Sequence, residues 1–367
     1  MSIATSVGGV RAVGVAALAS LALTVACGGS PAPATSSKPC SSTSSDRWSA
    51  QTVKSKTAPY NVTPIYDVPK NLTNCTIGFI NPGKSIPFFE TWSVAMHDAS
   101  AFYGVTFAED DVKLKYENEA TSFQTMSVKG LAAVGAHPGT PALLAATQAA
   151  NVPLITIDAT VAGNPYSIGV PNDQVGTTSG QKIAAAAKDK LSGAWSGKNL
   201  VFIGLSAGGC AACDTRVQSG LAAIKSVLTI ADSDVVVSEK AGGDPTVSEK
   251  VVTDVLTSHP NSVFAIVGLN DETVVGALHA LDAAHRLGDA LTVSLGADKL
   301  GRDALRNPTY ANTLLGAVDF NPYAEAWDLI AAEIALARGE SFKPYTVSVF
   351  LTAATVNISY PLPDNRV

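Results

Sequence analysis

A short apolar run rich in β-branched residues, Pro153-Leu-Ile-Thr-Ile-Asp158, stands near the middle of the chain. Such a run is typical of a buried strand in a parallel sheet. It ends on the carboxylate of Asp158, and a turn-rich segment with Gly163 and Pro171 follows before an Ala-rich helical pattern over residues 174–191. Because open α/β sheets bind ligands at the carboxyl ends of their strands, we expect Asp158 to lie in a ligand site.

The same alternation of strand and helix occurs on both sides of residues 159–171. Before them the pattern predicts strands at residues 75–81, 112–116, 128–135 and 153–158, and helices at 87–103 and 140–150. After them it predicts strands at residues 199–205, 234–240, 263–267, 291–296, 313–318 and 345–351. The expected helices there cover residues 174–191, 214–228 (capped by Asp214), 247–257 and 322–338, with one more that follows Asn270-Asp271 and ends at Leu287. This rhythm predicts an α/β fold of two Rossmann-like lobes with parallel sheets, joined by a hinge.

The N-terminus has the pattern of an export signal. Arg11 precedes a small, apolar stretch over residues 13–26, which is too short to span a membrane and fits a signal-peptide core. The stretch ends Leu23-Thr-Val-Ala-Cys27, which resembles a bacterial lipobox, in which the cysteine is lipidated. An ordinary cleaved signal with an incidental cysteine is the alternative.

We therefore expect a lipoprotein signal peptide at residues 1–27, with lipidation at Cys27. Residues 28–75 are rich in Ser, Thr and Pro at their start and predict a flexible tether followed by an N-terminal extension. A lipid anchor would hold the exported protein at the outer face of the cytoplasmic membrane without spanning it.

Composition narrows the class of partner. The chain has 367 residues, 46% of them hydrophobic and 15% charged, with a formal net charge of −6. This length suits two lobes. A mildly acidic chain without basic runs argues against nucleic acid as a partner.

Two motifs suggest catalysis, and each has a plainer interpretation. Gly204-Leu-Ser206-Ala-Gly208 matches a nucleophile elbow after a strand, but the helix does not begin at once and no histidine follows Asp298. Cys210-Ala-Ala-Cys213 precedes a helix, as in thiol-redox proteins, although an exported setting favours a structural disulfide. An exported hydrolase or thiol-redox enzyme therefore stays as the alternative function.

The four cysteines after Cys27 allow three disulfide connectivities. We prefer pairing of Cys210 with Cys213, which leaves Cys40 and Cys75 as the second pair. The histidines show no metal-site spacing, and no phosphate-binding loop is present, so we expect neither a metal nor a cofactor.

Polar and aromatic residues instead recur at strand ends and helix starts. They are Phe88, Phe89, Asp158, Arg216, Asn270 and Asp298. Each alone is most simply a cap or a surface group, but their shared position in a two-lobed fold predicts a ligand cleft.

Several segments resemble the ribose-binding-like periplasmic sugar-binding proteins of ABC transporters. They are Ile77-Gly-Phe-Ile, Pro87-Phe-Phe89, Val152-Pro-Leu-Ile-Thr-Ile-Asp158, Asn172 with Gly176, Asp214-Thr-Arg216, Asn270-Asp-Glu-Thr, Gly296-Ala-Asp298 and Asp319-Phe-Asn-Pro322. The resemblance implies the type I periplasmic binding protein fold. The N-terminal lobe would comprise residues 76–170 plus 321–348, and the C-terminal lobe residues 171–320 plus 349–367.

The resemblance also implies a function and residue roles. The protein would be a monomeric solute receptor that captures a sugar or polyol and presents it to an ABC permease. Phe88 and Phe89 would pack on the ligand ring, Asp158 and Asp298 would accept hydrogen bonds, and Arg216 and Asn270 would bind hydroxyls. Phe320 would be a further ligand-binding residue.

The chain departs from the family pattern at several site positions. Ile86, Ala159 and Phe320 stand where the family often has Asn, Arg and Gln, which argues against ribose itself. Ligand-responsive repressors share the fold, but they carry a DNA-binding headpiece where this chain has an export signal.

Overall fold

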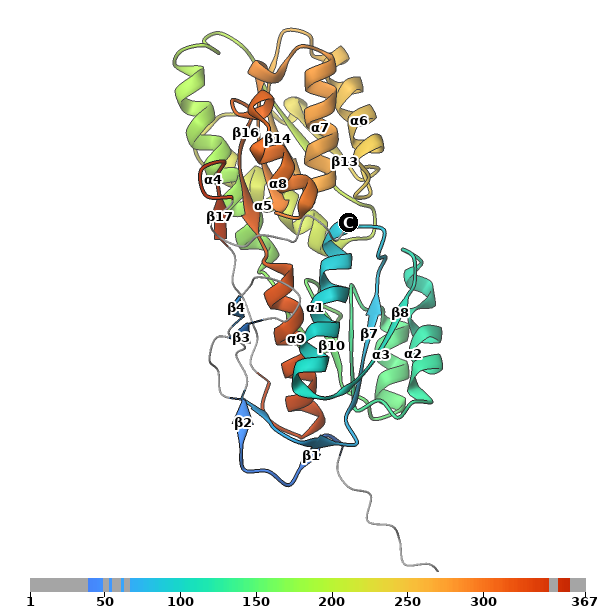
Figure 1. Ribbon diagram of the computed structural model, residues 1–367. Coiled ribbons are helices and arrows are strands. Elements are labelled where there is room, and N and C mark those ends of the chain that lie inside the picture. The colour runs from blue at the N-terminus through green and yellow to red at the C-terminus, as the bar shows by residue number, and fades with distance from the viewer. Residues whose placement is uncertain (1–38, 49–52, 55–60, 63–66, 343–348, 357–367) are drawn as a thin grey trace, which may run out of the picture. The chain divides into compact units, whose positions relative to one another are not determined.

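Two larger β-sheets, of five and six strands, organise the chain (Figure 1). The structure is a computed structural model that describes residues 39–48, 53–54, 61–62, 67–342 and 349–356. Both sheets are flanked by helices, and their strands are parallel except for the last one. The predicted α/β fold with parallel sheets is confirmed.

The five-stranded sheet and its helices form the first lobe. The strand order is β11-β10-β9-β7-β8, all parallel, from β7 (Thr76–Asn81), β8 (Thr106–Asp111), β9 (Ala133–Ala136), β10 (Leu154–Ile157) and β11 (Ser167–Ile168). One face packs against α1 (Pro87–Tyr103) and α9 (Pro322–Ala337), which run side by side in Figure 1. The other face packs against α2 (Glu119–Ser127) and α3 (Pro141–Ala149).

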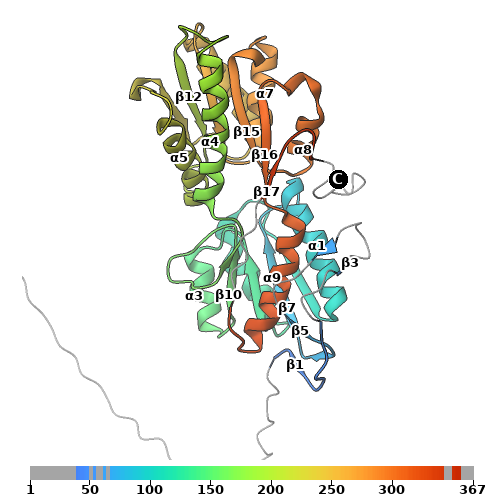
Figure 2. The same ribbon diagram turned by 90° about the vertical axis from the view of Figure 1, so that its left-hand side faces the viewer.

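The six-stranded sheet and its helices form the second lobe. Its order is β13-β12-β14-β15-β16-β17, from β12 (Leu200–Leu205), β13 (Val235–Ser238), β14 (Val263–Gly268), β15 (Ala290–Gly296), β16 (Leu314–Asp319) and β17 (Val349–Leu351), which is antiparallel to β16. Helices α4 (Asn172–Leu191) and α5 (Ala211–Lys225) cover one face. The other face packs against α6 (Pro245–Ser258), α7 (Asp271–Ala283) and α8 (Lys299–Arg306). Figure 2 shows α7 and α8 on the other side of the sheet from α4.

Local sequence explains where several helices begin. Proline occupies the first turn of α1, α3, α6 and α9, where its missing N–H costs nothing. The side chains of Thr140 and Asp244 accept hydrogen bonds from the backbone of α3 and α6. Short 3-10 helices occupy Tyr116–Asn118, Asp232–Asp234, Leu287–Asp289 and Pro308–Tyr310.

Several predicted element positions are wrong. The strand predicted at residues 128–135 begins only at Ala133 and ends at Ala136. The second strand of the first lobe is Thr106–Asp111, not residues 112–116. It lies at the sheet edge, where half-exposed positions tolerate acidic residues and no apolar run marks the strand. Helix α5 is capped by Cys210 rather than Asp214, and α7 ends at Ala283 rather than Leu287.

Cys40, Val68 and Leu72 of the N-terminal extension pack in the same core as β7, α1 and α9 of the first lobe. The strand pairs of the extension are β1 (Ser41–Ser42) with β6 (Leu72–Thr73), β2 (Arg47–Trp48) with β5 (Val68–Pro69), and β3 (Val53–Lys54) with β4 (Asn61–Val62). The sulfur atoms of Cys40 and Cys75 lie 2.04 Å apart, and Arg338 Nη1 donates to the carbonyl of Cys40 over 2.7 Å. These contacts tie the extension to β7 and to the residues just after α9.

The predicted signal peptide and Cys27 lie outside the described residues. Among the residues that the structure does describe, none of the helices combines the length and the apolar character needed to cross a membrane.

Candidate functional site

Aromatic and charged side chains from both lobes meet at the carboxyl ends of the two sheets. Phe88, in the first turn of α1, has its ring centroid 5.9 Å from that of Phe320, which directly follows β16. The guanidinium carbon of Arg216, on α5, lies 4.9 Å from the centroid of the Phe320 ring. The Arg216 charge also acts on Asp158, which directly follows β10. The structure therefore brings together four of the residues that the sequence singles out.

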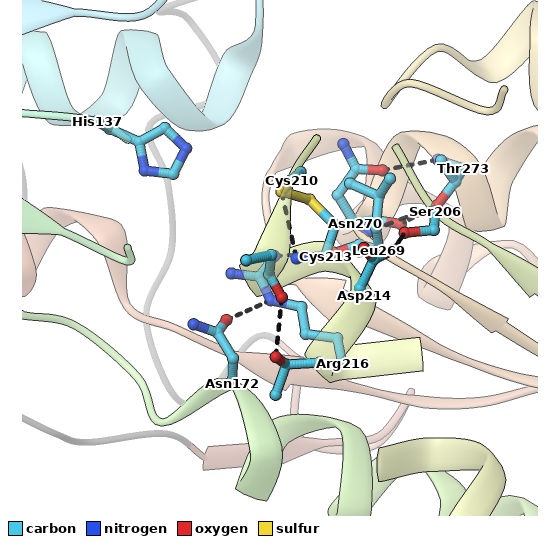
Figure 3. The surroundings of a disulfide bond; sticks show 12 residues. His137, Asn172, Ser206, Cys210, Cys213, Asp214, Arg216, Leu269, Asn270 and Thr273 are labelled. Atoms are coloured by element: carbon cyan, nitrogen blue, oxygen red, sulfur yellow. Dashed lines mark hydrogen bonds between the residues drawn. A yellow bond between two sulfur atoms is a disulfide. The ribbon is translucent and has the colours of Figure 1, made fainter. Parts of the chain in front are cut away.

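Close helix packing positions Arg216. Gly176 of α4 faces the backbone of Arg216, and a Cβ at Gly176 would collide with the Arg216 carbonyl oxygen. Arg216 Nε donates to Asn172 Oδ1 over 2.6 Å, and Nη1 donates to the carbonyl of Leu269 over 2.9 Å (Figure 3). The guanidinium is buried and fixed by residues from α4 and from the end of β14.

Asp158 is buried and sits in the left-handed region of backbone conformation, with φ 53°. Its Oδ1 accepts a hydrogen bond from the backbone N–H of Val170 over 3.0 Å, which joins the strand end to the segment before α4. Burial raises the pKa of Asp158, whereas the Arg216 charge and the Val170 hydrogen bond lower it.

Glu325, in the first turn of α9, is fully buried beside Asp158. Its Oε2 accepts a hydrogen bond from Trp92 Nε1 over 3.3 Å. Burial and the adjacent Asp158 charge raise the pKa of Glu325 well above its usual range. One proton shared between the two carboxyl groups relieves the repulsion of two like charges.

Three further carboxyl groups cluster in the second lobe. Asp271, at the start of α7, accepts hydrogen bonds from the Ser294 hydroxyl and, over 2.7 Å, from the backbone N–H of Asp298. Burial and the neighbouring acid raise the pKa of Asp271 well above its usual range. For the same reasons the pKa of Glu272 rises to about 7 and that of Asp298 to about 8.

Gly296 links this carboxyl cluster to the aromatic residues of the first lobe. A Cβ built on Gly296 would lie 2.8 Å from Asp271 Oδ2 and 3.6 Å from Cδ2 of Phe88. The φ of 125° at Gly296 is also unfavourable for other residues. The absence of a side chain here lets the first lobe approach Asp271.

The other predicted site residues have local structural roles. Asp298 caps α8, because its Oδ1 accepts from the Gly301 N–H over 3.1 Å, and Asn270 Oδ1 caps α7 by accepting from the Thr273 N–H over 3.1 Å. The Phe89 ring lies 5.3 Å from the rings of both Trp92 and His137. Their contacts with a ligand stay predictions.

Sequence reasoning missed Trp92, His137, Asp271, Glu272 and Glu325 as site residues. Acidic residues in a first helical turn are ordinary partners of the helix dipole, so Asp271 and Glu325 give no separate signal. His137 Nδ1 donates to the carbonyl of Ile157 over 2.7 Å, and burial lowers its pKa to about 4. It is therefore neutral at pH 7.

The motifs of the alternative enzyme hypothesis have structural partners. Ser206 is fully buried, and its hydroxyl donates to Asp214 Oδ1 over 2.5 Å rather than to a histidine (Figure 3). The sulfur atoms of Cys210 and Cys213 lie 1.96 Å apart at the start of α5. Within the described residues, no group of three His, Cys, Asp or Glu side chains could hold a metal ion.

Solved structures share this fold at low sequence identity. A solute-binding protein of an ABC transporter from Actinobacillus succinogenes 130z, with bound D-allose, matches with a TM-score of 0.65 and 18% identity over 77% of this chain and 99% of that one. A second solute-binding protein, from Bacillus halodurans C-125 with bound myo-inositol, matches with a TM-score of 0.66 and 17% identity over 77% of this chain and 96% of that one. A third, from Mycobacterium smegmatis with bound glycerol, matches with a TM-score of 0.65 and 19% identity over 78% of this chain and 97% of that one.

A sequence comparison with curated proteins finds no match. The family described as periplasmic binding protein domain matches residues 77–341, which is more than half of the chain and includes both sheets up to β16. The chain therefore belongs to the periplasmic binding protein domain family.

Proposed function

We propose that this protein is the solute-binding receptor of an ABC importer and that it captures a small hydroxylated molecule between its two lobes. The observation that carries the proposal is the meeting of Phe88 and Asp158 of the first lobe with Arg216 and Phe320 at the second. A ligand that contacts groups from both lobes favours the conformation in which those groups lie together. A membrane permease would recognise that conformation.

The chemistry of the site suits a polar ring. Carboxyl groups and a guanidinium make charge-assisted hydrogen bonds to hydroxyls, and the rings of Phe88 and Phe320 cover apolar faces. The structural relatives with bound D-allose, myo-inositol and glycerol support this ligand class.

The test is a thermal-shift screen of the full chain against sugars, polyols and their amino derivatives. A ligand that binds the folded state alone must raise the melting temperature by mass action. We expect Asp158→Asn to abolish the shift, and Asp254→Asn, at an exposed position paired with Lys250, to retain it. A screen without a shift would contradict the proposal.

The cellular setting belongs to the same proposal. We propose an exported monomer with the lobe boundaries given above, anchored to the outer face of the cytoplasmic membrane through Cys27. Its support is the lipobox-like end of the predicted signal and membership of an exported family. Cys27→Ser should move the protein from the membrane fraction to the soluble fraction. Unchanged membrane association would contradict the anchor.

A further inference from the structure

Buried acids outnumber buried bases around the candidate site. Within the described residues, the buried bases are Arg216 and Arg302, and no lysine is buried. Arg302 is already paired with Asp319, at 3.0 Å. The charges of three carboxyl groups act on Arg216, and they come from different parts of the two lobes: Asp158 directly after β10, Glu325 on α9 and Asp271 on α7.

Arg216 does not pair directly with any of these three acids. Within the described residues, its hydrogen bonds go to neutral acceptors, Asn172 Oδ1 and the Leu269 carbonyl, and its guanidinium lies over the Phe320 ring. In the described part of the chain no salt bridge joins Arg216 to a carboxylate. The three acids therefore keep acceptor capacity that Arg216 does not use.

Several buried carboxylate oxygens lack a hydrogen-bond donor. Near the candidate site they are Oε1 of Glu325, Oε1 of Glu272 and Oδ2 of Asp298. Elsewhere in the described part of the chain, Oε2 of Glu119 and both carboxylate oxygens of Glu333 are of the same kind. His137 is neutral at pH 7 and adds no compensating charge. Buried polar groups without partners are costly, so oxygens of this kind in a binding protein are candidates for a ligand's donors.

Aromatic rings stand beside the acids. The Phe88 ring lies 4.9 Å from Trp92 and 5.9 Å from Phe320, and Trp92 donates to Glu325. Carboxylates combined with aromatic faces are suited to a cation, because the negative face of a ring also attracts an ammonium group.

We propose that the ligand is a hydroxylated amine, such as an amino sugar or an aminopolyol, with its ammonium group bound among Asp158, Glu325 and Asp271. This inference rests on the proposed function and narrows its ligand class. The positive charge of the ammonium group compensates ionised carboxylates, whereas a neutral polyol leaves their like charges uncompensated, and an ammonium N–H can donate to Oε1 of Glu325. Each carboxyl group that ionises on binding releases one proton to solvent, so the binding is linked to proton release.

The first test compares matched pairs at pH 7 with the full chain: D-glucosamine with D-glucose, D-galactosamine with D-galactose, and D-glucamine with sorbitol. We expect at least one amine to bind tenfold or more tighter than its neutral partner by calorimetry. Equal or tighter binding of the neutral partners would overturn this inference and leave the proposed receptor function intact. Binding of neither kind would overturn both.

The second test separates the charge of Glu325 from its size. Glu325→Gln should weaken amine binding at least tenfold and leave binding of a neutral partner within about threefold. The matched control is Glu333→Gln, because Glu333 is also a fully buried acid of α9 but lies two turns away, about 12 Å, beside Gly135. Glu333→Gln should bind the amine as the unchanged protein does.

Proton linkage gives an independent readout of the same charge. The apparent enthalpy of amine binding should differ between phosphate and Tris buffers by the amount that corresponds to released protons, and the difference should shrink in Glu325→Gln. Two results would overturn the proposed role of the acids. One is an unchanged affinity of Glu325→Gln for the amine, and the other is an amine-binding enthalpy of the unchanged protein that is the same in both buffers.

Discussion

Two buried arginines of this protein stand in opposite electrostatic situations. Arg302 donates to Asp319 Oδ2 over 3.0 Å, to the Ala297 carbonyl over 2.7 Å and to the Val356 carbonyl over 2.9 Å. The pair is almost completely buried, and its charges compensate each other. The pKa of Asp319 still rises to about 6, because burial raises it more than the Arg302 charge lowers it.

Arg216 is equally fixed, but by neutral groups, and Glu325, one of the acids that act on it, has an oxygen, Oε1, without a hydrogen-bond donor. Burial lowers the pKa of Arg216, while the charges of Asp158, Glu325 and Asp271 raise it. Burial of an arginine therefore says little about its role. The Arg302 cluster is complete within the chain, whereas the Arg216 cluster has donors and acceptors left for a ligand.

Breaking the ion pair of Arg302 with Asp319 should have the greatest effect on stability. Arg302→Met should lower the free energy of unfolding by about 3–5 kcal/mol, because it leaves the Asp319 charge buried without a partner. Arg216→Met should cost less, about 1–2 kcal/mol, since it removes hydrogen bonds to neutral acceptors and breaks no ion pair. Urea denaturation of both variants measures the difference. Equal losses would contradict the contrast between the two clusters.

A change of pH should have an effect of intermediate size on the free energy of unfolding. Between the usual pKa of an aspartate and about 8, Asp298 is protonated in the folded protein and ionised in the unfolded chain. The folded state binds the extra proton, so stability falls as pH rises, by about 1.4 kcal/mol per pH unit for one such group. Urea denaturation from pH 5 to 8, without ligand, should show this decline.

Asp298→Asn tests whether that decline comes from the carboxyl cluster. The amide oxygen can still cap α8 through the Gly301 N–H, so the helix start is preserved. We expect a flatter stability profile between pH 5 and 8, while Asp254→Asn, at an exposed site, keeps the original slope. Parallel profiles for all three proteins would refute the assignment.

Removing the hydrogen bond from Trp92 to Glu325 should change the free energy of unfolding least. Trp92→Phe keeps a ring at the Phe88 contact but removes the donor to Glu325 Oε2. We expect a loss of about 1 kcal/mol in the free energy of unfolding at pH 7. Phe79→Leu, at a buried contact of Trp92 outside the acid cluster, provides a packing comparison, and its cost should not depend on pH. An unchanged or higher stability of Trp92→Phe would show that the hydrogen bond is unimportant.

Much of the fold follows from the sequence, because buried parallel strands are continuous apolar runs. The stretches at β10, β12 and β14 are of this kind, and their predicted positions agree with the structure. β8 is an exception, because Thr106–Asp111 lies at a sheet edge and needs no apolar run. The start of α5 also differs, since the Cys210 sulfur accepts from the Cys213 N–H and thereby takes the capping role expected of Asp214.

Three features can be predicted from the sequence alone: the α/β class, the restart of the strand–helix alternation after residues 159–171, and the positions of Phe88, Asp158, Arg216 and Phe320 near strand ends and helix starts. The proximity of Glu325 to Asp158, and of Asp271 to Arg216, follows only from the folded structure. The first turn of a helix accepts a carboxyl group both in water and in the protein interior, so the sequence of the helix does not distinguish between the two. The burial of the carboxyl group, its partners and the shift of its pKa depend on side chains that the fold brings in from distant parts of the chain.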